Sequence, residues 1–146
     1  MIALIQRVSG AGVSVDGAIL GTVGRGMLAL IGVAGTDSPE TGAKLLARLL
    51  SYRIFPDDAG KMNRDLREID GGLLLVPQFT LLADTRKGTR PGFSRAAPPD
   101  QARSLFQRLV QDAQAAHPRV AAGRFGADMQ VSLVNDGPVT FWLEVE

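Results

Sequence analysis

The chain has 146 residues, of which 45% are hydrophobic and 21% charged, and its formal net charge is +1. This length suits one domain with a real core, so we predict a single domain over residues 1–146. The near-neutral charge excludes a general nucleic-acid polycation, and the absence of cysteine excludes disulfides and thiolate chemistry. No apolar run approaches a membrane span of roughly 18 residues, and the N-terminus is not typical of a signal peptide. We therefore expect a cytoplasmic protein without membrane association.

The first part of the chain is predicted to form a meander of strands. Apolar residues alternate from Ile2 to Val8, and the alternation resumes at Val13 beyond two glycines. Asp16-Gly17 is a strong hairpin signal, and Ala18 to Val23 would be the return strand. Met27 to Val33 is apolar and predicts a buried strand. The spacing of the glycines fits neither dinucleotide-binding nor P-loop patterns, so we interpret them as turns.

Two amphipathic helices are predicted. Ser38 is a good N-cap and Pro39 suits the first helical position, so the first helix begins there. Its apolar residues at helical spacing are Ala43, Leu46, Leu49 and Leu50. The second helix follows Pro98-Pro99 and continues to about Ala116. Its apolar face carries Ala102, Leu105, Phe106, Leu109, Val110 and Ala113.

The remaining apolar segments predict short strands. They are Tyr52–Phe55, Leu73–Val76, Val120–Phe125, Met129–Val134 and Val139–Val145. Their order favours an α+β fold, in which a mostly antiparallel sheet curls into a barrel and two amphipathic helices pack on it. Asn135-Asp136-Gly137-Pro138 separates the last two strands, and taken alone this sequence favours a hairpin turn.

The candidate site lies between Gly71 and Pro91. The buried strand must end at Pro77, because proline has no N–H for the ladder. Gln78-Phe79-Thr80 follows, so polar side chains lie at the end of a buried strand, where rigid scaffolds often present chemistry. From spacing alone, an ordinary β-corner and a functional site are equally favoured. A basic loop comes next, with cations that could contact phosphate at Arg86, Lys87 and Arg90.

The sequence contains no evident metal site and no usual pair of nucleophile and base. Asp57-Asp58 has no third acidic or histidine ligand at suitable spacing, so we interpret it as a solvated turn. His117, the only histidine, stands at the end of the second helix, where the helix dipole stabilises a cation. Ser-His and Cys-His arrangements are therefore nearly excluded. We expect no metal and no cofactor.

Seven short motifs occur in order along essentially the whole chain, and together they resemble D-aminoacyl-tRNA deacylases of the bacterial and eukaryotic type, the D-Tyr-tRNA(Tyr) deacylase family. The motifs are Gln6-Arg7-Val8, Arg53-Ile54-Phe55, Gly60-Lys61-Met62-Asn63, Gln78-Phe79-Thr80-Leu81, Lys87-Gly88-Thr89-Arg90-Pro91, Phe125-Gly126-Ala127-Asp128-Met129 and Asn135-Asp136-Gly137-Pro138-Val139-Thr140. Two positions depart from the family pattern. Pro77 replaces a usual serine and Thr89 a usual asparagine, so a role for that serine is not carried over.

The resemblance implies hydrolysis of the ester that joins a D-amino acid, or glycine, to the terminal ribose of tRNA. It implies a catalytic site at Gln78, Phe79 and Thr80. The backbone N–H groups of Phe79 and Thr80 would form an oxyanion hole, in which each donor contributes about 3 kcal/mol. No side chain in view would accept the proton of Thr80, so we favour an orienting role for it, and a covalent role stays open. The ribose 2′-hydroxyl of the substrate would assist.

The resemblance also implies chiral proofreading by Gly137-Pro138. In the family this bond is cis, and its carbonyls enter the partner subunit's site and leave no room for an L side chain. Arg7 would brace this motif, Pro77 and Met129 would line the substrate site, and the protein would be a homodimer. Arg86, Lys87 and Arg90 would contact the tRNA. A second hypothesis stays open, a non-catalytic protein that binds RNA ends or small ligands on the same scaffold, because a usual base is absent.

Overall fold

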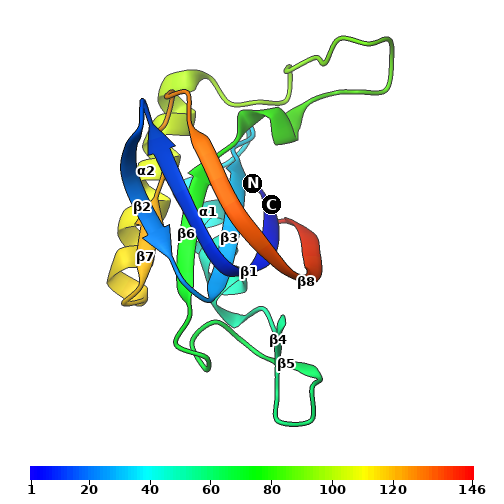
Figure 1. Ribbon diagram of the computed structural model, residues 1–146. Coiled ribbons are helices and arrows are strands. Elements are labelled where there is room, and N and C mark those ends of the chain that lie inside the picture. The colour runs from blue at the N-terminus through cyan, green and yellow to red at the C-terminus, as the bar shows by residue number, and fades with distance from the viewer.

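The computed structural model describes residues 1–146 as a curled sheet with two helices on one face (Figure 1). The strands of the main sheet are β1 (Ile2–Val15), β2 (Ala18–Val23), β3 (Gly26–Gly32), β6 (Gly72–Pro77), β7 (Val120–Ala122) and β8 (Gln130–Glu144). A separate two-stranded sheet consists of β4 (Phe55–Pro56) and β5 (Met62–Arg64). The helices are α1 (Pro39–Ser51), the short 3-10 helix η1 (Phe79–Leu82) and α2 (Pro99–Ala116). None of the helices has the length and apolar character that crossing a membrane requires.

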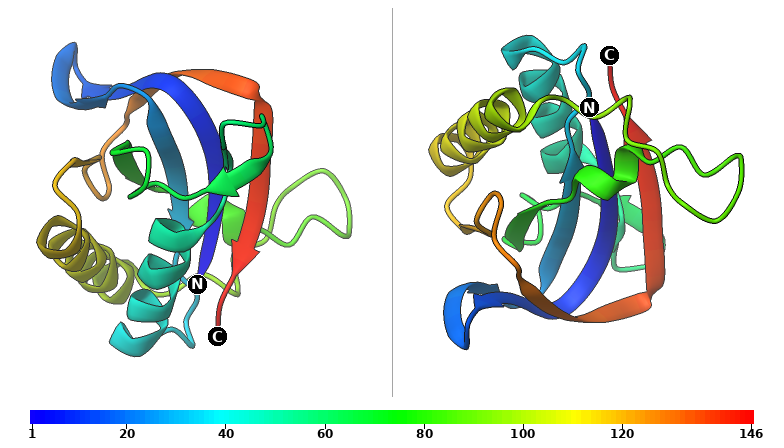
Figure 2. Two further views of the ribbon diagram at one scale, coloured as in Figure 1. Left: turned by 90° about the horizontal axis from the view of Figure 1, so that it is seen from below. Right: turned by 90° about the horizontal axis from the view of Figure 1, so that it is seen from above.

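The long strand β1 organises the sheet. β8 pairs antiparallel with β1 over nearly its whole length, while β3 pairs with residues 2–8 of β1 and β2 with residues 11–15. The two halves of β1 therefore have different neighbours along one edge, and the sheet curls between them (Figure 2). The predicted α+β fold with a mostly antiparallel sheet is confirmed. The pairings of β6 with β3 and with β7 are parallel, because α1 and α2 are the crossovers between these strands.

The curled sheet nearly closes where β2 approaches β7. A Cβ atom placed on Gly21 of β2 would lie 2.8 Å from the Cβ of Ala121 in β7. Only glycine allows the two strands to come this close. The closure therefore depends on two small residues facing each other.

Both faces of β6 are buried, as its continuous apolar sequence predicts. Leu73 and Leu75 belong to the main core between the sheet and the two helices, whereas Leu74 and Val76 belong to a smaller core inside the curl. Figure 2 shows α1 and α2 side by side on the outer face of the curl. The end of β6 is thus fixed from both sides, which makes it a rigid support for the segment that follows.

Several local predictions need correction. The buried face of α1 carries Leu45, Leu46, Leu49 and Leu50, and Ala43 is exposed because it lies one position off that face. The strand predicted at Tyr52–Phe55 is β4, which contains only Phe55 and Pro56. The strands predicted on either side of Asn135–Pro138 form the single strand β8. No hairpin forms there, because both halves pair antiparallel with β1 and the chain keeps its direction.

Candidate functional site

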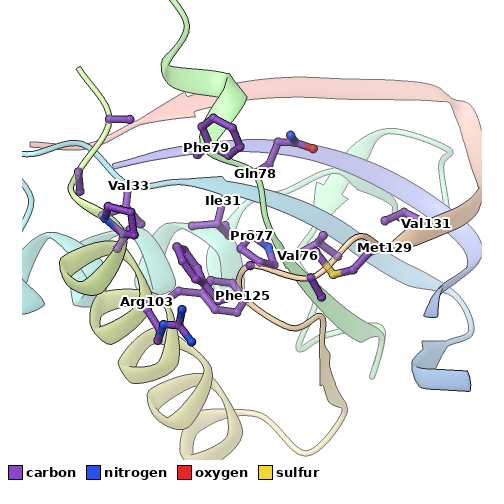
Figure 3. A pocket seen from close by; sticks show the side chains of 17 residues that line it. Ile31, Val33, Val76, Pro77, Gln78, Phe79, Arg103, Phe125, Met129 and Val131 are labelled. Atoms are coloured by element: carbon purple, nitrogen blue, oxygen red, sulfur yellow. The ribbon is translucent and has the colours of Figure 1, made fainter. Parts of the chain in front are cut away.

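A cavity of about 540 Å³ opens at the carboxyl end of β6, and 12 of its 17 lining residues are hydrophobic. Its walls come from the ends of β3 and β6, the first turns of α2, and the segment from Phe125 to Val131. Figure 3 shows Gln78 and Phe79 at one end of this cavity and Phe125 and Arg103 at the other. An apolar cavity with a few polar groups at its ends is typical of a site for a small organic group.

The corner after β6 follows from the proline that ends the strand. Pro77 is the last residue of β6, and the next backbone N–H, that of Gln78, donates to the carbonyl of Ile31 at 2.7 Å. The chain then turns into η1, which begins at Phe79. The first N–H groups of a helix have no acceptor within that helix. The amides of Phe79 and Thr80 are in this position.

The side chains of the corner offer hydrogen bonds but no base. The amide Nε2 of Gln78 donates to Oγ1 of Thr80, and both side chains lie at the surface. An amide does not accept a proton at neutral pH, so Gln78 cannot activate the Thr80 hydroxyl. Thr80 stands beside the cavity but does not line it. Phe79 is 56% exposed, and its ring packs against that of Phe93 with centroids 5.0 Å apart.

The basic loop extends from this corner, between η1 and α2, away from the body of the molecule (Figure 1). Its base is closed by two backbone hydrogen bonds between Asp84 and Gly92, of 2.7 and 3.0 Å. Arg86 donates to both carboxylate oxygens of Asp84, at 2.8 and 2.7 Å. These bonds hold the pKa of Asp84 well below its ordinary value and raise the pKa of Arg86. Arg86 is thus partly neutralised within the loop, whereas Lys87 and Arg90 are exposed and form no ion pair.

Met129 lies in the wall of the cavity, as does Pro77. Its Sδ atom accepts a hydrogen bond from the backbone N–H of Arg124 at 3.3 Å. A Cβ atom on Gly123 would lie 2.8 Å from this sulfur and 3.4 Å from Cδ of Pro77, so the absence of a side chain at residue 123 lets these groups pack. The structure therefore brings Pro77, Gln78, Phe79 and Met129 together, with Thr80 next to them.

Gly137-Pro138 lies elsewhere on the same chain. Asn135 pairs with Val8 and Thr140 with Gln6, so the four residues 136–139 of β8 bulge opposite Arg7 alone. The Gly137-Pro138 bond is cis, and both residues are exposed.

Arg7 fixes the start of this bulge. Its Nε donates to the carbonyl of Asp136 at 3.0 Å, and its Nη1 donates to the carbonyl of Ile54 at 2.8 Å. The corner at Gln78 is hydrogen-bonded to Ile31 of β3, and Ile31 pairs with Ala3 of β1, so the corner lies at the position of Ala3 along β1. The bulge is four residues further along β1, which is about 13 Å at the usual rise of a strand. Within one chain, the structure does not bring the bulge to the cavity.

Sequence reasoning missed the second wall of the cavity. Arg103 and Phe106 reach it from α2, and Arg103 lies over the ring of Phe125 with its guanidinium carbon 5.4 Å from the centroid. Phe106 was predicted only as a core residue. Arg103 gave no signal, because a charged residue between apolar positions of an amphipathic helix is ordinarily a solvated one.

The residues considered for metal binding or base catalysis have structural roles. The carboxylate of Asp57 accepts hydrogen bonds from the N–H groups of Ala59 and Lys61 and from Asn63, which confirms the predicted turn. His117 is the C-cap residue of α2, and it is buried with Nε2 2.6 Å from the carbonyl of Gly71. No group of three or more His, Cys, Asp or Glu side chains lies close enough together to hold a metal ion.

Comparisons with known proteins agree over the whole chain. A family model described as D-Tyr-tRNA(Tyr) deacylase matches residues 4–144. A protein of Pseudomonas entomophila named D-aminoacyl-tRNA deacylase is 61% identical over 145 residues, which are 99% of this chain and 100% of that protein. One of the same name from Alkalilimnicola ehrlichii is 60% identical over 144 residues, or 99% of this chain and 96% of that protein.

Two solved structures have the same fold. One, described as c-Myc DNA Unwinding Element Binding Protein, has a TM-score of 0.95 at 34% identity and covers 100% of this chain and 99% of its own. The other, described as a probable eukaryotic D-amino acid tRNA deacylase, has a TM-score of 0.88 at 18% identity, with coverage of 99% and 98%.

Proposed function

The chain belongs to the D-Tyr-tRNA(Tyr) deacylase family, and on that premise we propose that it hydrolyses the ester of D-aminoacyl-tRNA and releases free D-amino acid and tRNA. The observation that carries this proposal is the cavity at the end of β6, because backbone amides without helical acceptors stand at one end of it. An aminoacyl ester is already reactive, so holding the carbonyl, polarising its oxygen and admitting water are sufficient.

The amides of Phe79 and Thr80 are the proposed oxyanion donors. They open η1, whose position is fixed by the buried side chain of Leu82 and by the hydrogen bond from Gln78 to Ile31. Preorganised N–H groups of this kind contribute about 3 kcal/mol each to the transition state. The Thr80 hydroxyl, which accepts from Gln78, has no base beside it and orients the substrate or water. The ribose 2′-hydroxyl of the substrate is the group that assists the attack.

The terminal adenosine of the tRNA occupies the rest of the cavity. Phe125 offers a ring for the base to stack on, and Pro77 and Met129 offer apolar surface around it. In the basic loop beside the corner, the exposed Lys87 and Arg90 are freer than Arg86 to meet RNA phosphates, since Arg86 is held by Asp84.

Chiral selection is proposed to come from a second copy of the chain. Gly137-Pro138 is exposed on the bulge that Arg7 holds, and it is too far along the sheet to serve its own cavity. In a homodimer each bulge would enter the partner's site, where its carbonyls would hold the amino group of the substrate and exclude an L side chain. Glycine has no side chain to exclude, so glycyl-tRNA would also be hydrolysed.

An apolar strip that is only partly covered, with Leu4 and Leu30 half-buried, favours this homodimer. Leu4 pairs with Leu30 on one side and with Trp142 on the other, so the three side chains are cross-strand neighbours. They lie on the face of the sheet opposite to Ala3 and Ile5, which pack in the core under the helices. Trp142 is 50% exposed. A symmetric partner that covers this strip would also bring its own bulge to the neighbouring chain.

The deciding experiment is to incubate the protein with D-tyrosyl-tRNA and L-tyrosyl-tRNA side by side and to follow release of the amino acid. Rapid loss of the D-ester with the L-ester intact is the expected result. Loss of both esters would keep the hydrolase and reject the role of Gly137-Pro138. Binding of both charged tRNAs without turnover would instead favour the alternative, a non-catalytic protein that binds RNA ends.

A further inference from the structure

A second cavity, of about 630 Å³, adjoins the first behind Arg103 and Phe125. The two cavities share three lining residues, Arg103, Phe106 and Phe125. The second cavity lies between α2 and the chain that follows β7, and it is more polar than the first. It is therefore a continuation of the candidate site, with a different chemical character.

The second cavity is positively charged. Arg103 and Arg124 line it, no acidic residue does, and neither arginine has a carboxylate within 4.0 Å. Gln107 and Gln111 add side-chain amides to the same wall. Unpaired guanidinium groups next to neutral hydrogen-bond donors are suited to bind a phosphodiester.

The two cavities are arranged in the order that the end of an RNA strand requires. The corner at Gln78-Phe79 stands at one end of the first cavity, and Arg103 stands at the other (Figure 3). In a terminal nucleotide, the 3′-ester and the 5′-phosphate are on opposite sides of the ribose. With the ester at the corner and the base beside Phe125, the 5′-phosphate would extend toward the end of the cavity that Arg103 lines, where the second cavity begins.

We propose that the second cavity binds the phosphodiester on the 5′ side of the terminal nucleoside, with Arg103 and Arg124 as its ligands. This inference rests on the proposed function, because it requires the ester to lie at the end of β6. Its consequence is that the protein reads a phosphorylated RNA end through α2 and the segment after β7, in addition to any contact made by the basic loop.

The first test is a binding comparison that needs no turnover. Isothermal titration calorimetry with adenosine and with adenosine 5′-monophosphate measures what the phosphate adds to affinity. We expect the monophosphate to bind about tenfold more tightly to the wild type, and Arg124→Gln to remove most of that advantage. Arg124→Lys, which keeps the charge at the same position, should retain most of it.

The second test compares two D-esters that differ in the phosphate. Arg124→Gln should lower kcat/KM for D-tyrosyl-tRNA about tenfold more than for 3′-O-D-tyrosyl-adenosine, and it should reduce the dependence of log KM on log salt by about 0.7. The matched control is Arg108→Gln. Arg108 lies on the same helix but is paired with Asp112 and lines neither cavity, so both esters should be hydrolysed as by the wild type.

Equal affinity of the wild type for adenosine and its monophosphate would overturn the inference, as would an equal loss on both esters in Arg124→Gln. A wild type that hydrolyses neither ester would overturn the proposed function instead, and the calorimetry would still decide whether the second cavity binds phosphate.

Discussion

Gly32 is the residue at which the link between core packing and catalysis can be tested most directly. It ends β3 beneath η1, and a Cβ atom there would overlap Cδ2 of Leu82 and lie 3.1 Å from Cβ of Leu81 and 3.3 Å from the carbonyl oxygen of Gln78. Leu82 is 1% exposed, so its side chain cannot move into solvent. The substitution Gly32→Ala must therefore displace η1 itself.

The expected cost has two parts. Overpacking a core by one methyl group costs about 1–3 kcal/mol of unfolding free energy, which for a chain of this size lowers Tm by roughly 2–4 °C per kcal/mol. The shift of η1 also moves the proposed oxyanion amides of Phe79 and Thr80. Because one well-placed donor is worth about 3 kcal/mol, partial misplacement of two should lower kcat at least about tenfold.

The assay combines guanidinium unfolding with single-turnover deacylation of D-tyrosyl-tRNA. The matched control is Gly42→Ala in α1, where a Cβ atom would meet only Cε of Met1 at an ordinary 3.8 Å. This control should be as active as the wild type and more stable by about 0.5–1 kcal/mol, because alanine is favoured over glycine within a helix. A Gly32→Ala variant with reduced stability and unchanged kcat would refute the assigned role of η1.

Three further changes test other parts of the site. Thr80→Val keeps the backbone amide and removes the hydroxyl, so an orienting Thr80 predicts a fall in kcat of roughly tenfold or less, whereas abolished single-turnover hydrolysis would indicate a covalent role. Gly137→Ala adds a side chain where φ is +142°, a conformation that L-residues rarely adopt; deacylation should fall steeply while adenosine binding persists, and normal D-specific turnover would contradict the proposed role of the bulge. Arg86→Gln removes the guanidinium whose hydrogen bonds do most to lower the pKa of Asp84 but keeps the backbone N–H of residue 86, so an NMR titration should show that pKa rising part of the way toward its ordinary value. Because the pKa is depressed in the folded state, the stabilisation from the Asp84–Arg86 ion pair is present above the ordinary pKa and lost as pH falls through the depressed pKa. An unchanged titration would show that Arg86 is not the cause.

The parts of the fold that could be predicted are those decided by local chemistry. Pro77 must end β6 because it lacks an N–H, and Asp16-Gly17 forms the predicted turn with φ values of 50° and 79°. Ser38 caps α1 as expected. What could not be predicted depends on distant partners. The continuity of β8 through its bulge depends on pairing with β1, more than 120 residues earlier, and no local pattern distinguishes it from a hairpin.

The same distinction holds for the site. The corner at Gln78–Thr80 could be predicted because polar side chains follow directly after the apolar residues of a buried strand. The sequence itself places Pro77 at the corner, whereas the substrate-lining roles of Pro77 and Met129 are implied only by the family resemblance. Arg103 is exposed on α2 and becomes part of the site only because the helix crosses the end of β6, which is a property of the tertiary structure.

Where Gly21 faces Ala121, the barrel is closed by van der Waals packing between β2 and β7, with no backbone hydrogen bonds between the two strands. β2 forms backbone pairs with β1 alone and β7 with β6 alone, so the edges that face each other share no strand pairing. Separating them would cost little hydrogen-bond energy, and their edge amides should exchange with solvent faster than those of β3. Leu20 and Ala122, which flank this seam, also line the second cavity. We therefore expect any local opening of the barrel to begin along this seam, beside the proposed phosphate-binding cavity, and not at the paired strands that hold η1.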